Sequence, residues 1–156
     1  MHVYRGLPSS FATPIALTIG NFDGVHRGHQ AMLGRLMEAA EDLALPPAVL
    51  TFDPPPREFF ARDKAPPRLS TLRTKIEQFR AHGVAHTIIA RFGAQLASLS
   101  PETFIDEVLV RMLRVRWVLV GEDFRFGKGR TGDLATLRRA ARSFSVEAMR
   151  TVSVEG

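Results

Sequence analysis

The chain has 156 residues, of which 45% are hydrophobic and 24% charged, as expected for a soluble single domain with a sizeable core. It contains no cysteine, which excludes disulfides, thiol catalysis and cysteine-ligated zinc. The net charge of +5 favours anionic partners, but no basic tail concentrates it, so we do not expect a nucleic-acid partner. No segment resembles a membrane span or a secretory signal, and we therefore expect a cytoplasmic protein without a membrane partner.

Apolar runs and helical periodicities alternate through the first half of the chain. Residues 15–19 are predicted as a buried strand, followed by a helix whose apolar positions recur from Leu33 to Leu43. A second strand is predicted at 48–52, and the proline-rich stretch 53–69 is predicted as a long ordered loop. Ser70 or Thr71 can then cap a helix that ends at Gly83. A third strand follows at 87–91.

The second half continues the same alternation. Ser100 and Pro101 supply an N-cap and a first-turn proline to a helix whose apolar residues run from Phe104 to Met112. A strand at 117–120 leads into a second glycine-rich loop. Asp133 can cap the last helix, and 146–154 is predicted as the final strand.

Five strands alternating with four helices predict one α/β domain over residues 1–156, a Rossmann-like α/β/α sandwich with a five-stranded parallel sheet. The strands lack strict polar alternation, as expected when helices cover both faces of a sheet. Ligands of such sheets lie beyond the carboxyl ends of the strands, where the strand order reverses. The loops 21–28, 53–57 and 121–132 all follow strands, so we expect them to converge on one site.

The most informative segment is IGNFDGVHRGH, from Ile19 to His29, in which a strand passes through a glycine turn into a helix start. Unpaired backbone N–H groups and the positive end of the helix dipole make this arrangement suitable for an anion. His26 and His29 add hydrogen-bond donors for a phosphate, which indicates an enzyme acting on a nucleotide. The alternative is a pair of surface or packing histidines. A protein metal site is disfavoured, because carboxylates are sparse and only Asp23 is well placed.

Two further loops carry candidate binding residues. Asp53 and the prolines 54–56 can offer a rigid acceptor and a flat apolar wall, although a stiff turn is an equally simple interpretation. In GEDFRFGKGRTGD, Phe124 and Phe126 alternate with Arg125, so the loop could stack a ring and neutralise phosphates. The alternative there is a solvated basic hairpin.

The segments GNFDGVHRGH, FDPPP and VGEDFRFGKGRTGD resemble, in order and spacing, the adenylyltransferase module of bacterial FAD synthetases, the bifunctional riboflavin kinase/FMN adenylyltransferases. PRLSTLRTKIEQF, SPETFIDEVLV and GDLATLRRAA are similar too, so the resemblance spans nearly the whole chain. It implies a nucleotidyltransferase fold and transfer of AMP from ATP to FMN, giving FAD and pyrophosphate. It also implies Mg²⁺ carried mainly by the ATP phosphates, with no metal held by the protein alone.

The resemblance also implies roles for individual residues. His26 and His29 would be the catalytic residues that hold the ATP phosphates. The ATP-binding set is Gly20, Asn21, Phe22, Asp23, Gly24, His26, Gly28 and His29. The flavin-binding set is Asp53, Pro54, Pro55, Pro56, Asp123, Phe124, Arg125, Phe126 and Gly127.

One departure from the family pattern concerns the C-terminal end. In the family a Ser-Ser-Thr-x-Ile-Arg segment follows the last strand and contributes to the nucleotide site, whereas this sequence ends at Gly156. We therefore expect a truncated domain with reduced turnover and without the riboflavin kinase domain. Two alternatives stay open: a fragment that binds FMN or ATP without catalysis, and another His-x-Gly-His nucleotidyltransferase with a different acceptor.

Overall fold

The computed structural model describes residues 1–22, 27–54 and 71–150. Within them, six parallel strands form one sheet in the order β1-β4-β3-β2-β5-β6. The strands are β1 (His2–Arg5), β2 (Ile15–Ile19), β3 (Pro47–Phe52), β4 (His86–Ala90), β5 (Val115–Gly121) and β6 (Ser145–Met149).

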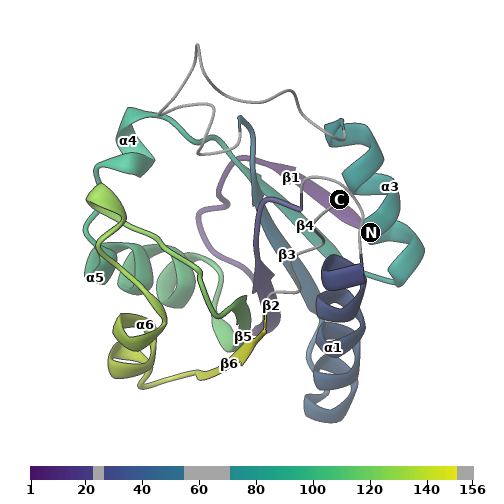
Figure 1. Cartoon of the computed structure of the whole chain (residues 1–156). Helices are drawn as coiled ribbons and strands as arrows, with labels where there is room; N and C mark the ends of the chain where they lie inside the picture. The colour runs from purple at the N-terminus through teal and green to yellow at the C-terminus, as the bar shows by residue number, and fades with distance from the viewer. Residues whose placement is uncertain (23–26, 55–70, 151–156) are drawn as a thin grey trace.

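Helices cover both faces of this sheet (Figure 1). One face carries α1 (Arg27–Leu43) and α3 (Leu72–His82). The other face carries α4 (Ala94–Ala97), α5 (Pro101–Thr103) with its π-helical continuation η1 (Phe104–Met112), and α6 (Leu134–Ala140). A short 3₁₀ turn, η2 (Lys128–Arg130), interrupts the loop between β5 and α6. The predicted Rossmann-like α/β/α sandwich is thereby confirmed.

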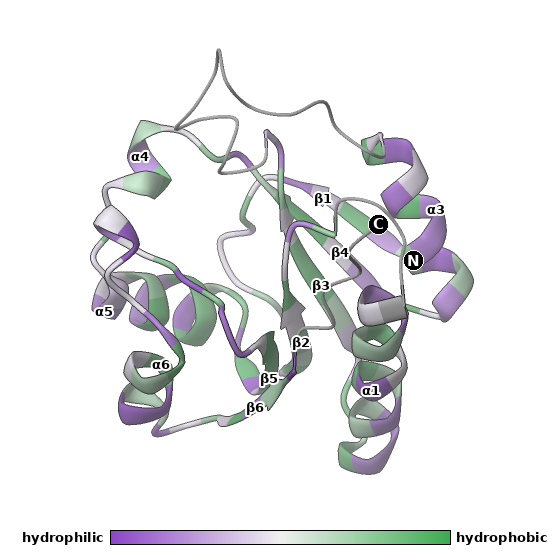
Figure 2. Cartoon of the chain, viewed as in Figure 1, coloured by the Kyte–Doolittle hydropathy of each residue, from purple (hydrophilic) through white to green (hydrophobic). Residues whose placement is uncertain are grey.

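Each face of the sheet has its own apolar cluster. Leu33 and Leu36 of α1 pack with Phe79 of α3 on one face, whereas Ile105 and Leu109 of η1 pack on the other. Figure 2 shows the apolar central strands between helices with hydrophilic outer surfaces. Within residues 1–22, 27–54 and 71–150, no helix combines the length and apolarity that crossing a bilayer requires.

The predicted helix boundaries are confirmed by their capping contacts. Thr71 accepts a hydrogen bond from the backbone N–H of Thr74, and Gly83 ends α3 with φ of 92°. Ser100 accepts from the N–H of Thr103 with Pro101 in the first turn. Asp133 forms a capping box with Thr136.

The predicted strand number was wrong, because the sheet has a sixth strand, β1, at its edge. Its sequence, HVYR, has no apolar run. Among the described residues it pairs with β4 alone, so burial imposes little hydrophobic pattern on it. The short helix α4 was also not predicted, since four residues are too few to show a helical period. The predicted ordered loop 53–69 lies mostly outside the described residues, as do residues 151–154 of the predicted last strand.

The β1–β4 edge contains a half-buried histidine, His86, whose Nδ1 lies 3.1 Å from the hydroxyl of Tyr4. Its ring stacks on that of His2 at 5.6 Å and contacts Phe11 at 5.2 Å. Burial lowers the pKa of His86, and the nearby positive groups, His2 and the N-terminal amine, lower it further. The folded state therefore binds the His86 proton less readily than the unfolded chain does.

We accordingly expect stability to fall as the pH drops below about 6.5, the ordinary pKa of histidine, because the unfolded state then gains a proton that the fold resists. Above that pH His86 is neutral in both the folded and the unfolded state, so it no longer reduces the stability. Denaturant unfolding of the wild type and His86→Phe at pH 7.5 and 5.5 measures it. The variant should lose less stability between the two pH values, and an equal loss in both proteins would contradict the assignment to His86.

Candidate active site

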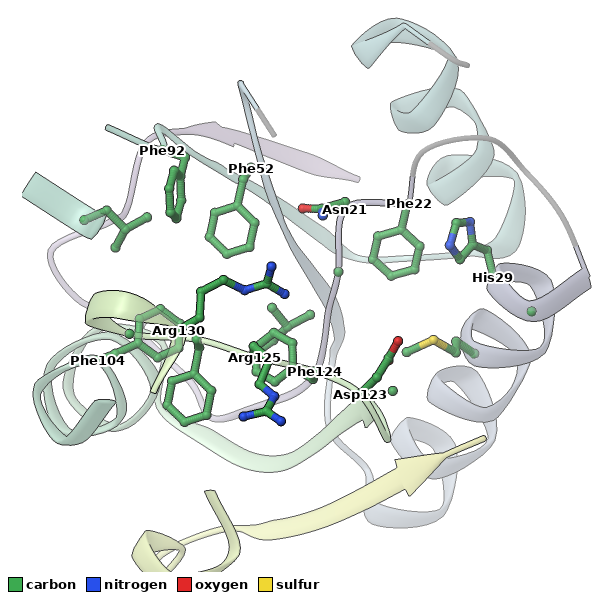
Figure 3. A pocket seen from close by; sticks show the side chains of 18 of the residues that line it. Asn21, Phe22, His29, Phe52, Phe92, Phe104, Asp123, Phe124, Arg125 and Arg130 are labelled. Carbon is green, nitrogen blue, oxygen red and sulfur yellow. The ribbon is translucent and has the colours of Figure 1, made fainter. Parts of the chain in front are cut away.

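A pocket of about 320 Å³ opens at the carboxyl ends of the central strands (Figure 3). β2 pairs with β3 on one side and β5 on the other, so the strand order reverses here, where ligands of parallel sheets bind. The loops after β2 and β5 and the ends of β3 and α1 all contribute. The lining residues are Ile19, Gly20, Asn21, Phe22, Gly28, His29, Met32, Phe52, Phe92, Leu96, Ala97, Phe104, Gly121, Asp123, Phe124, Arg125, Phe126, Gly127, Arg130 and Arg150.

The loop after β2 is anchored to β3 by its backbone. The N–H of Gly20 donates to the carbonyl of Leu50 at 3.1 Å, and the Thr51 hydroxyl donates to the carbonyl of Asn21 at 3.3 Å. Phe22 has a left-handed φ of 52° and is only 4% exposed. A side chain on Gly20 would place its Cβ 3.1 Å from the Phe22 ring, which explains the glycine. The backbone therefore takes a left-handed conformation at Phe22, with its ring buried against Gly20.

His29 lies in the first turn of α1 and faces the pocket together with Gly28. Its ring meets the edge of Phe22 with centroids 5.1 Å apart at 61°, and Phe22 in turn packs on Phe79 at 5.2 Å. The histidine is thus supported by a buried aromatic pair. The first backbone N–H groups of α1 lack intrahelical acceptors, so this end of the pocket suits an anion.

The opposite end of the pocket is aromatic. Phe52 and Phe92 meet edge to face at 5.8 Å, and Phe124 stacks on Phe126 at 5.4 Å with an interplanar angle of 15°. Phe104 closes this group from η1 at 5.5 Å from Phe126. Such walls bind a flat aromatic ligand by stacking and by removing its surface from water.

The loop that carries Phe124 and Phe126 is cross-linked by its own backbone. Phe126 and Gly132 exchange two hydrogen bonds, at 3.0 and 2.8 Å, and the N–H of Lys128 donates to the carbonyl of Leu99 at 2.6 Å. Gly127 packs so closely on Pro101 that an added Cβ would lie 2.7 Å from the Cγ atom of that proline. These contacts hold the loop against the start of α5.

Charges are unevenly distributed around the pocket. Arg125, Arg130 and Arg150 line it, and Asp123 is the carboxylate among the described lining residues. Nη1 of Arg125 lies 3.8 Å from Oδ2 of Asp133. Hydrogen bonds from Thr136 lower the pKa of Asp133, and Arg125 contributes further, so this carboxylate stays ionised. The pocket is therefore net positive over the part of the chain that the structure describes.

The structure brings together most of the described residues that the sequence singled out. Gly20, Asn21, Phe22, Gly28 and His29 line the pocket, and so do Asp123, Phe124, Arg125, Phe126 and Gly127. Asp53 and Pro54 follow Phe52 and are half-buried, but they are not lining residues. Asp23, Gly24, His26, Pro55 and Pro56 lie outside the described residues, so their predicted placement stays a prediction.

Several lining residues were missed by sequence reasoning. Phe52 and Phe92 stand at or just after the carboxyl ends of β3 and β4, which is the signal that could have found them. Phe104 was predicted only as an apolar residue of a helix, and it belongs to both the core and the pocket wall. Arg150 follows β6 and belongs to no recognisable sequence motif, so its place in the pocket becomes evident only from the order of the strands in the sheet.

Gly127 and Gly129 offer a matched pair for testing the loop. Both have positive φ, 80° and 65°, but only the Cβ of Gly127→Ala would meet Pro101, whereas that of Gly129→Ala meets nothing nearer than 3.8 Å. We expect Gly129→Ala to lower the free energy of unfolding by about 1 kcal/mol and Gly127→Ala by about 2–4 kcal/mol. Denaturant unfolding of the two variants measures this, and equal losses would show that the Pro101 contact is unimportant.

Several known proteins are similar in sequence to this chain. The "Bifunctional riboflavin kinase/FMN adenylyltransferase" of Escherichia coli K12 is 43% identical over 150 residues, which cover 94% of this chain and 48% of that protein. Its Pseudomonas fluorescens counterpart of the same name is 46% identical over 141 residues, covering 89% and 45%. The chain therefore spans about half the length of the curated relatives it matches.

A crystal structure of a macrolide-efflux protein from Streptococcus pneumoniae superposes with a TM-score of 0.84 at 21% identity, covering 99% of this chain and 53% of that chain. At this identity the likeness establishes the fold alone. The family model of FAD synthetase matches residues 9–156, which confirms the resemblance seen in the three motifs. This chain is a member of the FAD synthetase family.

Proposed function

We propose that this chain transfers AMP from ATP to FMN, producing FAD and pyrophosphate. One observation carries the proposal: a single pocket joins the N-terminus of α1, with His29, to an aromatic chamber flanked by arginines. The first end suits a polyphosphate and the second suits a flavin ring. The relatives from Escherichia coli and Pseudomonas fluorescens, named for riboflavin kinase and FMN adenylyltransferase, support the same assignment.

The ATP phosphates would bind at the start of α1. There the first backbone N–H groups of α1, which have no acceptor within a helix, and the His29 ring offer donors that can follow charge onto the phosphates as it develops. Phe22 fixes the His29 ring from behind, so the donor needs little reorganisation during the reaction. His26 would act beside His29, and Asp23 and Gly24 would shape the turn between them.

The flavin ring would bind among the phenylalanines at the other end. Phe52, Phe92 and Phe124 come from three different segments, so a ring packed against them can contact apolar surface from more than one segment. Asp123 and Arg125 would then face the polar edge of the flavin. Asp53 and the prolines 54–56 would close the site from the β3 side.

The reaction needs little covalent chemistry from the protein. A phosphate oxygen of FMN is already ionised near neutral pH, so it can attack the α-phosphorus of ATP without a general base. One P–O bond forms, the bond to pyrophosphate breaks, and no enzyme intermediate is required. Catalysis would come from alignment of the two phosphates and neutralisation of their charge.

Magnesium would enter with ATP as part of the substrate. In the described residues, no group of three or more histidine, cysteine, aspartate or glutamate side chains gathers to hold an ion. Mg²⁺ commonly keeps several waters and binds through substrate phosphates, so a Mg–ATP complex fits this pocket. The ion would supply charge neutralisation at the phosphates.

The proposal predicts that the purified chain forms FAD when it is mixed with FMN, ATP and Mg²⁺. Chromatography measures the FAD that is formed. Loss of the His29 donor should cost roughly 3 kcal/mol of transition-state stabilisation, about a hundredfold in rate, so His29→Ala should be nearly inactive. His82→Ala is the matched control, because His82 bonds the carbonyl of Gln78 within α3 and lines no part of the pocket.

The outcomes separate the alternatives. FAD formed by the wild type and by His82→Ala, but not by His29→Ala, supports the proposal. Saturable FMN or ATP binding without FAD would instead favour a binding fragment. Turnover with a different phosphorylated acceptor, independent of flavin, would favour another nucleotidyltransferase. Full activity of His29→Ala would contradict the role given to His29.

A further inference from the structure

Arg130 occupies an unusual backbone position in the loop after β5. Three residues of this loop have left-handed φ values: Gly127 at 80°, Gly129 at 65° and Arg130 at 55°. The first two are glycines, which adopt such φ values without a steric penalty. The third is an arginine, for which this conformation is strained, so this position carries a side chain where glycine would fit without strain.

The strain is maintained by the backbone contacts around it. The N–H of Arg130 donates to the carbonyl of Gly127 at 3.0 Å, and the Thr131 hydroxyl donates to the carbonyl of Lys128 at 2.8 Å. The paired Phe126 and Gly132 close the turn at its base. Arg130 is therefore presented from a closed turn rather than from an open loop.

The Arg130 side chain extends into the pocket. Figure 3 shows it reaching from its loop towards the middle of the pocket, in this view between Phe52 and Phe124. Over the described part of the chain, no ion pair or hydrogen bond engages its guanidinium. Arg125 differs, because it already pairs with Asp133 at 3.8 Å. Arg130 thus offers a full set of donors to a ligand.

The chemistry of that ligand follows from the surroundings. A guanidinium binds phosphate through two parallel hydrogen bonds, and the aromatic wall beside it suits a ring in the same molecule. The nucleotide donor has a separate anion site at the start of α1, about His29. Two anionic substrates that must approach each other each require a cation, since their phosphates otherwise repel.

On this basis, and resting on the proposed function, we propose that Arg130 is the specificity-determining residue that binds the phosphomonoester of the acceptor flavin. It makes the site select FMN over unphosphorylated riboflavin. The flavin ring lies against the phenylalanines, and the Arg130 guanidinium holds the phosphate where it can reach the α-phosphorus of ATP. Discrimination between FMN and riboflavin therefore depends on the charge of Arg130, whereas affinity for the flavin ring depends on the phenylalanines.

The test compares the dissociation constants of FMN and riboflavin, measured by flavin fluorescence, in the wild type and Arg130→Gln. Losing hydrogen bonds to a charged group should weaken FMN binding about ten- to hundredfold, and riboflavin binding should not change. Lys128→Gln is the matched control, because it removes the same charge from the same turn at an exposed residue that does not line the pocket. It should bind both flavins like the wild type.

A second variant separates binding from folding. Arg130→Gly relieves the left-handed strain, so its thermal midpoint should equal or exceed that of the wild type while its FMN affinity falls as in Arg130→Gln. Unchanged FMN binding in Arg130→Gln, or an equal loss of affinity for FMN and riboflavin, would overturn the role given to Arg130 but not the proposed function. A wild type that binds neither flavin and makes no FAD would overturn the proposed function as well.

Discussion

The direct pairing of β2 with β5 is the constraint on which the candidate site depends. Thr18 on β2 donates a fully buried hydrogen bond to the carbonyl of Leu119 on β5 at 2.9 Å, across 101 positions of sequence. Because both strands are parallel, their carboxyl ends meet at one edge, and the loops that follow them become opposite walls of one pocket. A shift of register here would separate His29 from Phe124 and Arg130 without altering either loop.

This dependence explains what could be predicted from the sequence and what could not. Local signals were sufficient for the caps at Thr71, Ser100 and Asp133, because each satisfies backbone groups within three residues. Apolar runs were likewise sufficient for the buried strands β2, β3, β4 and β5 and for the half-buried β6. The edge strand β1 and the wall residue Arg150 carry no local signal, since their positions follow from strand order and not from their own neighbours.

The two ends of the pocket obtain their positive character in different ways, and this affects how specific each can be. At the start of α1 the donors are largely backbone N–H groups, which many sequences can supply, so a phosphate site there says little about the rest of the ligand. At the other end the charge comes from arginine side chains, among them Arg130, which a strained turn holds near phenylalanines. This end of the pocket is therefore defined by particular side chains, and the proposed binding of the acceptor there depends on them.

An ion pair connects helix α1 with strand β6. Arg35 of α1 forms two hydrogen bonds with Glu147 of β6, Nε to Oε2 at 2.6 Å and Nη2 to Oε1 at 2.8 Å, and its guanidinium lies 5.8 Å from the Trp117 ring centroid. The Arg35 hydrogen bond lowers the pKa of Glu147, so the pair stays charged. Exposed pairs usually contribute little, but a two-point contact fixes direction. The pair therefore links the helix that carries His29 to the strand that leads to Arg150 by a contact of defined direction.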